Sequence, residues 1–408
     1  MIKGLSVFFL VLFTTSSSAQ LMGFQLPEGE KKVEIPFEFR NNLILIDLIF
    51  DDVFPLTFIF DTGSENTILV KKEFTDLLNV SYEREFAVLG ADYQKTLVAY
   101  LTRNINMDLP NLLGSKLDIL VLKEDYFQFE EFTGLTIHGI LGMDLFKTFT
   151  IEINYKKQIL TLHRVEDFKV PDNRFSVLEA DIHRNKPYIQ AVAEVKGDTA
   201  TNVKLLLDTG ASLSLMLHND SDSSIVMPSK LIPGKLGNGL GGYIAGFVGR
   251  INQLAFDNYE FNGVITNFQE VGDSLRYKVN NDRNGIIGNE ILSRFTVIFD
   301  IARSKVYFKP IKRYNRFFKY DKSGISLIAS GEALSEFRVK ELVPNSPAEE
   351  AGVQVGDKLV NINYTPTSFY DLRKITRILQ RRSGKRIRLV ILRNGERKVF
   401  KFTLRDLI

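Results

Sequence analysis

Two short motifs combine a carboxyl group, a hydroxyl group and a glycine at widely separated points of the chain. They read Asp61-Thr62-Gly63, followed by Ser64, and Asp208-Thr209-Gly210, followed by Ala211. Two carboxyl groups held about 3 Å apart cannot both ionise cheaply, so they share one proton and supply an acid and a base together. Such a pair can activate water for attack on an amide without a metal or a covalent intermediate. The two motifs therefore predict acid–base chemistry by paired aspartates.

The residue after each motif introduces an asymmetry. The Ser64 hydroxyl can donate a hydrogen bond toward the Asp61 carboxylate, whereas Ala211 has no donor for Asp208. A donor stabilises the charged form of a carboxylate. We therefore expect the negative charge of the pair to favour Asp61.

Both motifs belong to a longer internal repeat with an offset of 146 to 147 residues. Each follows an apolar run, and each is followed about 80 residues later by two apolar residues and a glycine. The matched segments are 56–60 and 203–207, 139–142 and 285–288, and 149–154 and 295–300. This agreement over several segments indicates two copies of one unit.

The repeated unit has the composition of β structure. Short runs of strand-forming residues are interrupted by Gly, Asn, Asp and Pro, and long helical periodicity is absent before residue 340. An aspartate at the end of a buried strand, followed by Thr and Gly in a tight turn, places a carboxylate on a rigid backbone. Each unit supplies half a site, and an approximate twofold axis would bring the halves face to face.

These motifs resemble the two active-site halves of aspartic proteases, and most closely the retropepsin-like proteases of bacteria in a single-chain form. The resemblance covers about residues 33–310. It implies a mainly β, two-lobed acid-protease β-barrel fold with lobes at residues 33–165 and 172–310. It also implies catalysis by Asp61 and Asp208 on polypeptide substrates, without a metal or cofactor. Supporting positions carried over from the family are Thr62, Gly63, Ser64, Thr209, Gly210, Ala211, Gly142 and Gly288, the last two beneath the loops.

The same family closes a β-hairpin flap over its substrate. The repeat offset places candidate flaps at residues 89–100 and 236–247, without assigning a flap tyrosine. Residues 237–242 also fit the GxGxxG pattern of dinucleotide-binding loops. No strand of a parallel sheet precedes them and the following residues form a poor helix, so we favour the flap.

The composition changes after Pro310. Residues 311–322 form a basic linker with several aromatic residues, which we interpret as a solvated connector whose aromatics pack on a lobe, and not as a lipid or nucleic-acid site. Residues 372–408 carry 13 Lys and Arg but only 2 Asp and Glu, which is typical of a solvated positive face.

Residues 343–353 and 355–363 closely resemble bacterial PDZ domains, and the resemblance spans about residues 323–405. It implies an α+β domain that binds a peptide between a sheet edge and a helix near residues 370–381. The family's loop for a peptide's C-terminal carboxylate corresponds to Gly324, Ile325, Ser326 and Leu327. Peptide binding and a packing role both remain open for this domain.

The first residues have the pattern of a signal peptide. Lys3 precedes an apolar run from Leu5 to Phe13, and Ser17-Ser18-Ala19 fits a cleavage site before Gln20. The alternative is an N-terminal anchor helix. We expect residues 1–19 to be removed and the mature chain, which has no later apolar run of about 18 residues, to carry no integral membrane segment.

Composition limits the remaining functions. The chain has 408 residues, a net charge of +3 and no cysteine, which excludes disulfides, zinc–thiolate sites and thiol catalysis. An exported chain without cysteine suggests a periplasmic or secreted protein of a bacterial envelope. We expect an aspartic endopeptidase with a PDZ domain for peptide or substrate recognition and no nucleic-acid partner. The alternative is a catalytically silent protease-fold scaffold that acts as a PDZ-led peptide-binding protein. A nucleotide-dependent oxidoreductase is a more distant alternative.

Overall fold

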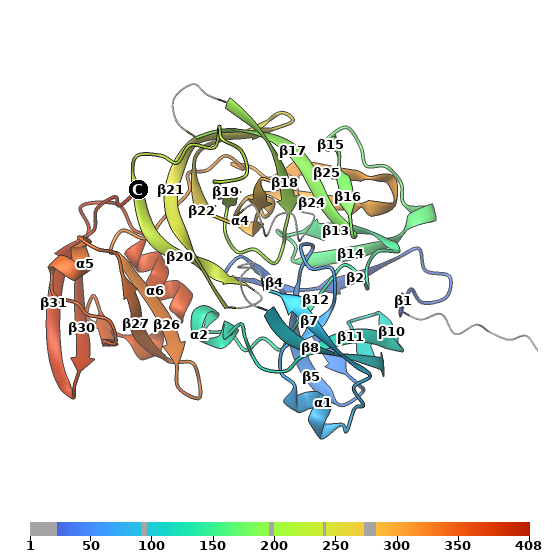
Figure 1. Cartoon of the computed structure of the whole chain (residues 1–408), viewed down its shortest axis with the longest axis horizontal. Helices are drawn as coiled ribbons and strands as arrows, with labels where there is room; N and C mark the ends of the chain where they lie inside the picture. The colour runs from blue at the N-terminus through green and yellow to red at the C-terminus, as the bar shows by residue number, and fades with distance from the viewer. Residues whose placement is uncertain (1–22, 91–95, 196–199, 240–241, 273–282) are drawn as a thin grey trace, which may run out of the picture.

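The computed structural model describes residues 23–90, 96–195, 200–239, 242–272 and 283–408. The expected signal peptide, residues 1–19, lies outside this part of the chain. The described residues form two β units and a C-terminal unit, coloured from blue to red in Figure 1. None of the described helices is long and apolar enough to cross a membrane.

The secondary structure is mainly β, as the sequence predicts. The first β unit (residues 23–167) contains β1 (Gly23–Gln25), β2 (Lys32–Pro36), β3 (Glu38–Arg40), β4 (Leu43–Phe50), β5 (Phe54–Phe60), β6 (Ile68–Leu69), α1 (Glu73–Leu77), β7 (Arg84–Leu89), β8 (Thr96–Ile105), β9 (Met107–Asp108), β10 (Leu113–Ser115), β11 (Leu117–Leu122), α2 (Phe129–Thr133), β12 (Gly139–Leu141), β13 (Phe149–Asn154), β14 (Ile159–Arg164) and the 3-10 helix η1 (Val165–Asp167). The second β unit (residues 176–310) contains β15 (Ser176–Glu179), β16 (Asp181–His183), β17 (Lys186–Glu194), β18 (Ala200–Leu207), β19 (Leu215–His218), β20 (Leu231–Gly239), β21 (Gly242–Phe256), β22 (Tyr259–Gln269), β23 (Gly285–Ile287), α4 (Asn289–Leu292), β24 (Phe295–Asp300), η2 (Ile301–Arg303) and β25 (Lys305–Pro310). The C-terminal unit (residues 325–403) contains β26 (Ile325–Ser330), β27 (Glu336–Leu342), α5 (Pro347–Glu350), β28 (Lys358–Ile362), β29 (Thr365–Pro366), η3 (Thr367–Phe369), α6 (Leu372–Leu379), β30 (Arg386–Arg393) and β31 (Glu396–Thr403).

The internal sequence repeat is also a repeat of topology. The first unit has the strand order β5-β12-β6-β11-β8-β7, and the second has β18-β23-β19-β22-β21-β20. In each unit the strand that leads into the Asp-Thr-Gly motif pairs in parallel with the apolar strand before the later glycine, β5 with β12 and β18 with β23. Both units therefore present their aspartate from the same place in the sheet.

A shared sheet joins the two β units. Its strand order is β15-β25-β24-β13-β14-β2, so three strands of the second unit continue into three strands of the first in one hydrogen-bonded sheet. The repeat-related strands β13 and β24 pair antiparallel, with Ile151 opposite Phe299 and Ile153 opposite Val297. Since these residues belong to one buried core that includes both units, the units cannot separate without exposing apolar surface.

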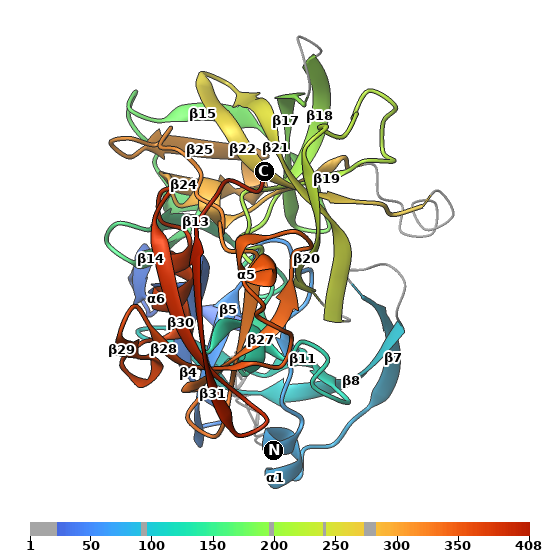
Figure 2. The same ribbon diagram turned by 90° about the vertical axis from the view of Figure 1, so that its left-hand side faces the viewer.

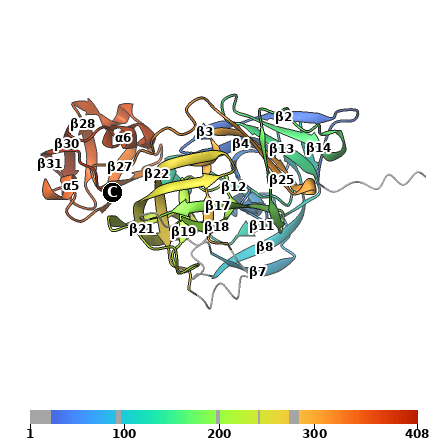
Figure 3. The same cartoon turned by 90° about the horizontal axis from the view of Figure 1, so that it is seen from above.

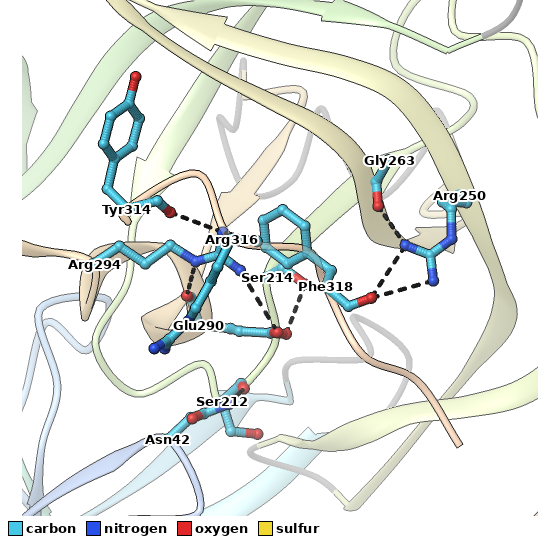
Figure 4. Close-up of polar contacts among 10 residues, drawn as sticks. All are labelled: Asn42, Ser212, Ser214, Arg250, Gly263, Glu290, Arg294, Tyr314, Arg316 and Phe318. Atoms are coloured by element: carbon cyan, nitrogen blue, oxygen red, sulfur yellow. Dashed lines mark hydrogen bonds and ion pairs between the residues drawn. The ribbon is translucent and has the colours of Figure 1, made fainter. Parts of the chain in front are cut away.

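The linker segment 311–322 is packed against the second β unit (Figure 4). The Arg294 guanidinium donates to the carbonyls of Tyr314 (2.9 Å) and Arg316 (2.7 Å) and stacks 3.6 Å from the ring centre of Phe318. Arg250 donates to the carbonyl of Phe318 at 3.3 Å. The aromatic residues pack as expected, and the basic side chains of Lys312, Arg313 and Lys319 are exposed, while the buried Arg294 and the half-buried Arg250 bind the backbone carbonyls of the linker.

The C-terminal unit has its own core. Its sheet has the order β26-β27-β28-β30-β31, with β26 at one edge, and α6 contributes Leu372, Ile375 and Leu379 to the interior. Asp371 caps α6 by accepting from the Lys374 N–H at 2.7 Å. This unit lies at one end of the molecule in Figures 1 and 3 and faces the viewer in Figure 2.

Candidate functional site

Each aspartate of the two motifs follows directly from a buried strand. Asp61 comes after β5, and its N–H donates to the Leu141 carbonyl of β12 at 3.0 Å. Asp208 comes after β18, and its N–H donates to the Ile287 carbonyl of β23 at 3.0 Å. The parallel neighbour strand therefore fixes the backbone of each carboxylate-bearing residue.

The two threonines lock the motifs to each other. The N–H of Thr62 donates to Oγ1 of Thr209 and the N–H of Thr209 donates to Oγ1 of Thr62, both at 3.0 Å. Each hydroxyl then donates across the interface, Thr62 to the Leu207 carbonyl at 2.8 Å and Thr209 to the Phe60 carbonyl at 2.9 Å. Both threonine side chains are fully buried. These four bonds hold the loops in a twofold arrangement.

The glycines allow the carboxyl groups to approach. A Cβ atom at Gly63 would lie 2.5 Å from Cγ of Asp208, and one at Gly210 would lie 2.3 Å from Cγ of Asp61. Any larger residue would collide with the opposite carboxyl group, which explains why glycine is required here. The structure therefore brings Asp61 and Asp208 together, each against the backbone of the other motif.

The two carboxyl groups share one environment. Burial, and then the negative charge of Asp208, raise the pKa of Asp61 well above its ordinary value of 3.8. The N–H groups of Gly63 and Ser64 donate to Oδ1 of Asp61 at 2.7 and 3.2 Å and act in the opposite direction. A raised pKa keeps a proton on the pair at a pH where an exposed carboxyl group is ionised.

The expected role of the Ser64 hydroxyl is wrong. This hydroxyl donates to the Asn66 carbonyl at 2.8 Å and not to Asp61. The second loop supplies the same backbone donors as the first, since the N–H groups of Gly210 and Ala211 reach Oδ1 of Asp208 at 2.8 and 2.9 Å. The raised pKa of Asp61 belongs to the coupled pair, so the preference for charge on Asp61 stays a prediction.

The raised pKa of Asp61 predicts a stability effect of its own. The folded chain binds this proton more tightly than the unfolded chain, so the free energy of unfolding should fall as the pH rises from about 4 through the raised pKa. The Asp61→Asn variant lacks this proton. Its stability relative to the wild type should therefore increase with pH, by about 1.4 kcal/mol for each unit of elevation. Urea unfolding of both proteins at pH 4, 6 and 8 measures this, and a constant difference would contradict it.

Gly142 and Gly288 lie beneath the two loops. A Cβ atom at Gly142 would lie 2.4 Å from the Asn66 carbonyl, and one at Gly288 would lie 2.3 Å from the Leu213 carbonyl. Their N–H groups donate to Oγ1 of Thr67 at 3.1 Å and to the Ser214 carbonyl at 3.0 Å. Each glycine therefore allows the segment after the motif to rest directly on its backbone.

Sequence reasoning missed an acidic residue two positions after each of these glycines. Asp144 accepts from the N–H (3.0 Å) and hydroxyl (2.8 Å) of Thr67, and Glu290 accepts from the Ser214 hydroxyl at 2.9 Å (Figure 4). Burial raises the pKa of both carboxyl groups. They brace the segments that follow the motifs, and their matching places in the repeat were the available signal.

Both candidate flap segments are antiparallel hairpins. Residues Arg84–Leu89 of β7 pair with Thr96–Leu101 of β8, and β20 pairs with β21. Residues 91–95 and 240–241 of these candidate segments lie outside the described residues. In the second hairpin Gly239 is opposite Gly242, so the described residues of the GxGxxG stretch belong to two antiparallel strands. That position does not fit a dinucleotide-binding loop, which connects a strand to a helix.

No cluster suited to a metal ion occurs in the described ranges, where no three His, Asp or Glu side chains are grouped to hold one. A cavity of about 400 Å³ lies at the junction of the linker with the C-terminal unit, lined by residues that include Arg250, Tyr320 and Arg381. Neither aspartate of the motifs lines it. The paired carboxyl groups of Asp61 and Asp208 are therefore the candidate catalytic site of the β units.

The C-terminal unit presents an edge strand beside a helix. Strand β26 is at the edge of its sheet, pairing with β27, and it packs against α6 through the shared core. The PDZ domain family matches residues 338–393. This part of the chain is a PDZ domain. The match confirms the sequence prediction, and the helix expected near residues 370–381 is α6. No curated protein sequence matches the chain.

The expected carboxylate loop of the PDZ domain is partly engaged by its own chain. Oδ1 of Asp321 accepts from the N–H groups of Ser323 (2.9 Å) and Gly324 (2.6 Å), and the N–H of Ile325 donates to Oγ of Ser323 at 3.1 Å. Burial raises the pKa of Asp321 to about 6. The N–H groups of Gly324 and Ile325 therefore have partners within the chain, and the assignment of this loop to a peptide's C-terminal carboxylate stays a prediction. Ser326 and Leu327 lie in β26, opposite Glu341 and Val339.

Proposed function

We propose that this protein is an aspartic endopeptidase in which Asp61 and Asp208 activate a water molecule. The observation that carries the proposal is the close approach of the two carboxyl groups across cross-bonded threonine loops. The raised pKa of Asp61 supports proton sharing, which the reaction requires. The match of both motifs to one repeated topology supports equivalent roles for the two residues.

In the proposed reaction the pair starts with one proton. The ionised carboxylate takes a proton from water as the water oxygen bonds to the scissile carbonyl carbon, and the protonated carboxyl group donates to the carbonyl oxygen. The resulting diol collapses when a proton passes to the amide nitrogen and the C–N bond breaks. Because the carboxyl groups titrate as a unit, the pH profile reports two constants of the pair and not of either residue.

The PDZ domain supports a role in peptide recognition beside this site. We propose that polypeptides are the substrates and that the chain acts after export, in the periplasm or outside the cell. The second candidate function is a PDZ-led binding protein with a silent protease fold. In the loop of the PDZ domain the N–H groups of Gly324 and Ile325 already donate to Asp321 and Ser323, so this loop does not favour the binding protein over the peptidase.

Hydrolysis of an unfolded polypeptide tests the proposal. The purified protein should cleave it between pH 3 and 7 with a bell-shaped profile. A hydroxyl-bearing transition-state mimic of the pepstatin type should inhibit cleavage, whereas a metal chelator and a serine-directed reagent should not. Cleavage sites and rates are read by mass spectrometry. No cleavage across this range would favour the silent scaffold, and inhibition by the chelator alone would contradict the two-aspartate mechanism.

A further inference from the structure

The edge of the PDZ domain that could accept a peptide is covered by the first β unit. Within the described residues β26 pairs only with β27, and α2 lies against β26 on its other side (Figure 1). The chain turns at Gly134, directly after α2, with a φ of 64°. A Cβ atom there would lie 3.5 Å from the Cβ atoms of Ala329 and of Leu372. Ala329 belongs to β26 and Leu372 to α6, so this turn reaches the space between the strand and the helix.

The contact extends over the edge to the next strand. Glu131 of α2 lies 3.9 Å from Nζ of Lys340 in β27, and the same ammonium group lies 6.0 Å from the ring centre of Phe132. Segment 129–134 therefore spans the edge from β27 to α6. An extended peptide added to β26 would occupy the same space, because a new strand lies about 4.8 Å from its neighbour.

This covering segment is anchored in the first β unit. Glu130 and Asp125 lie 3.3 and 3.4 Å from Nζ of Lys71, and the Thr133 carbonyl accepts from Nδ2 of Asn41 at 2.6 Å. Toward the PDZ domain, Glu131 and Lys340 form a pair of partly exposed charges, and such pairs contribute little to stability. Relative motion between domains of one chain is the general expectation unless their interface is large and hydrophobic.

We propose that residues 129–134 form a lid over the peptide-accepting edge of the PDZ domain, so that an extended polypeptide segment binds β26 only after displacing them. The apparent affinity for such a segment is then reduced by the fraction of molecules in which the lid is closed. Opening leaves the first β unit intact, because the anchors of α2 lie within that unit. The lid does not depend on the chemistry of Asp61 and Asp208.

A reversible covalent lock tests the lid. The chain has no cysteine, and the 3.5 Å between Cβ positions at residues 134 and 329 fits a disulfide. In the full-length Gly134→Cys/Ala329→Cys protein, oxidation should close the lid and dithiothreitol should release it. The probe is a fluorescein-labelled pool of random ten-residue peptides with free carboxylates, followed by fluorescence anisotropy. We expect the oxidised protein to bind at least about tenfold more weakly than the same protein after reduction.

The matched controls are the two single-cysteine variants, whose binding should not respond to oxidant. Equal binding by the locked and reduced proteins would overturn the lid. If the peptide pool bound neither the oxidised nor the reduced protein, the edge of the PDZ domain would serve packing and not peptide binding. If the disulfide did not form in the folded protein, the closed contact between residues 134 and 329 would be contradicted. Hydrolysis of short peptides, measured on the same samples, should be equal in both states. If hydrolysis were absent from both the oxidised and the reduced protein while peptide binding still depended on oxidation, the result would count against the peptidase and not against the lid.

Discussion

Asparagine at position 61 or 208 should lower kcat for peptide hydrolysis by about 10² to 10⁴-fold or more, because each change removes one member of the proton-sharing pair. An amide can neither take the proton from water nor hold the proton that polarises the carbonyl. The shape of the side chain is kept, and its oxygen can still accept from the N–H groups that reach Asp61 and Asp208. Initial rates on a defined peptide measure the loss, and thermal unfolding checks that both variants remain folded.

The matched control for these variants is Asp257→Asn. Asp257 is exposed in the turn between β21 and β22, with a φ of 49° that asparagine tolerates well. This variant should retain full activity. Substantial hydrolysis by either Asp61→Asn or Asp208→Asn would contradict the two-aspartate mechanism, since the proposed chemistry needs both carboxyl groups.

Phe318→Ala should destabilise the protein by about 3 to 5 kcal/mol, which is the usual result of truncating a buried aromatic residue. The Phe318 side chain is 1% exposed and lies under the Arg294 guanidinium at 3.6 Å. Its removal leaves a cavity and takes away the ring face that stabilises a buried cation. Urea unfolding measures the change. A chain shortened at Lys309 should show an even larger loss, because Arg294 would also lose its carbonyl partners.

The neighbouring residue provides the control for this prediction. Phe317 is 67% exposed, although its ring lies 4.6 Å from the Arg250 guanidinium. Phe317→Ala should cost no more than about 1 kcal/mol, the contribution of an exposed cation–π contact. Equal losses from the two variants would mean that the linker contributes through general hydrophobicity and not through the packing of Phe318 against the second unit.

The sequence allowed the site to be predicted because its main determinants are local and repeated. The run into Asp61, the glycine two positions later and the same pattern at Asp208 follow from short stretches of residues. Since both copies fold to the same strand order, equivalent residues had to occupy equivalent places. The helix expected near residues 370–381 followed from the resemblance of residues 343–363 to PDZ domains, and the structure has α6 there.

The tertiary structure decided the features that depend on partners far away in the chain. The Ser64 hydroxyl points to Asn66, because two backbone N–H groups already satisfy the facing oxygen of Asp61. The hydrogen bonds from Arg294 to the carbonyls of Tyr314 and Arg316 in linker 311–322 could not be predicted from the linker residues alone.

The cover over β26 comes from a short helix almost 200 residues earlier, and nothing in either segment alone indicates the contact. Sequence by itself therefore determined the repeated β units, the paired aspartates and the PDZ domain. Only the packing of the whole chain decided which polar groups have hydrogen-bond partners and which surfaces are covered. Burial and hydrogen bonding depend on all neighbours in space, including those distant in sequence.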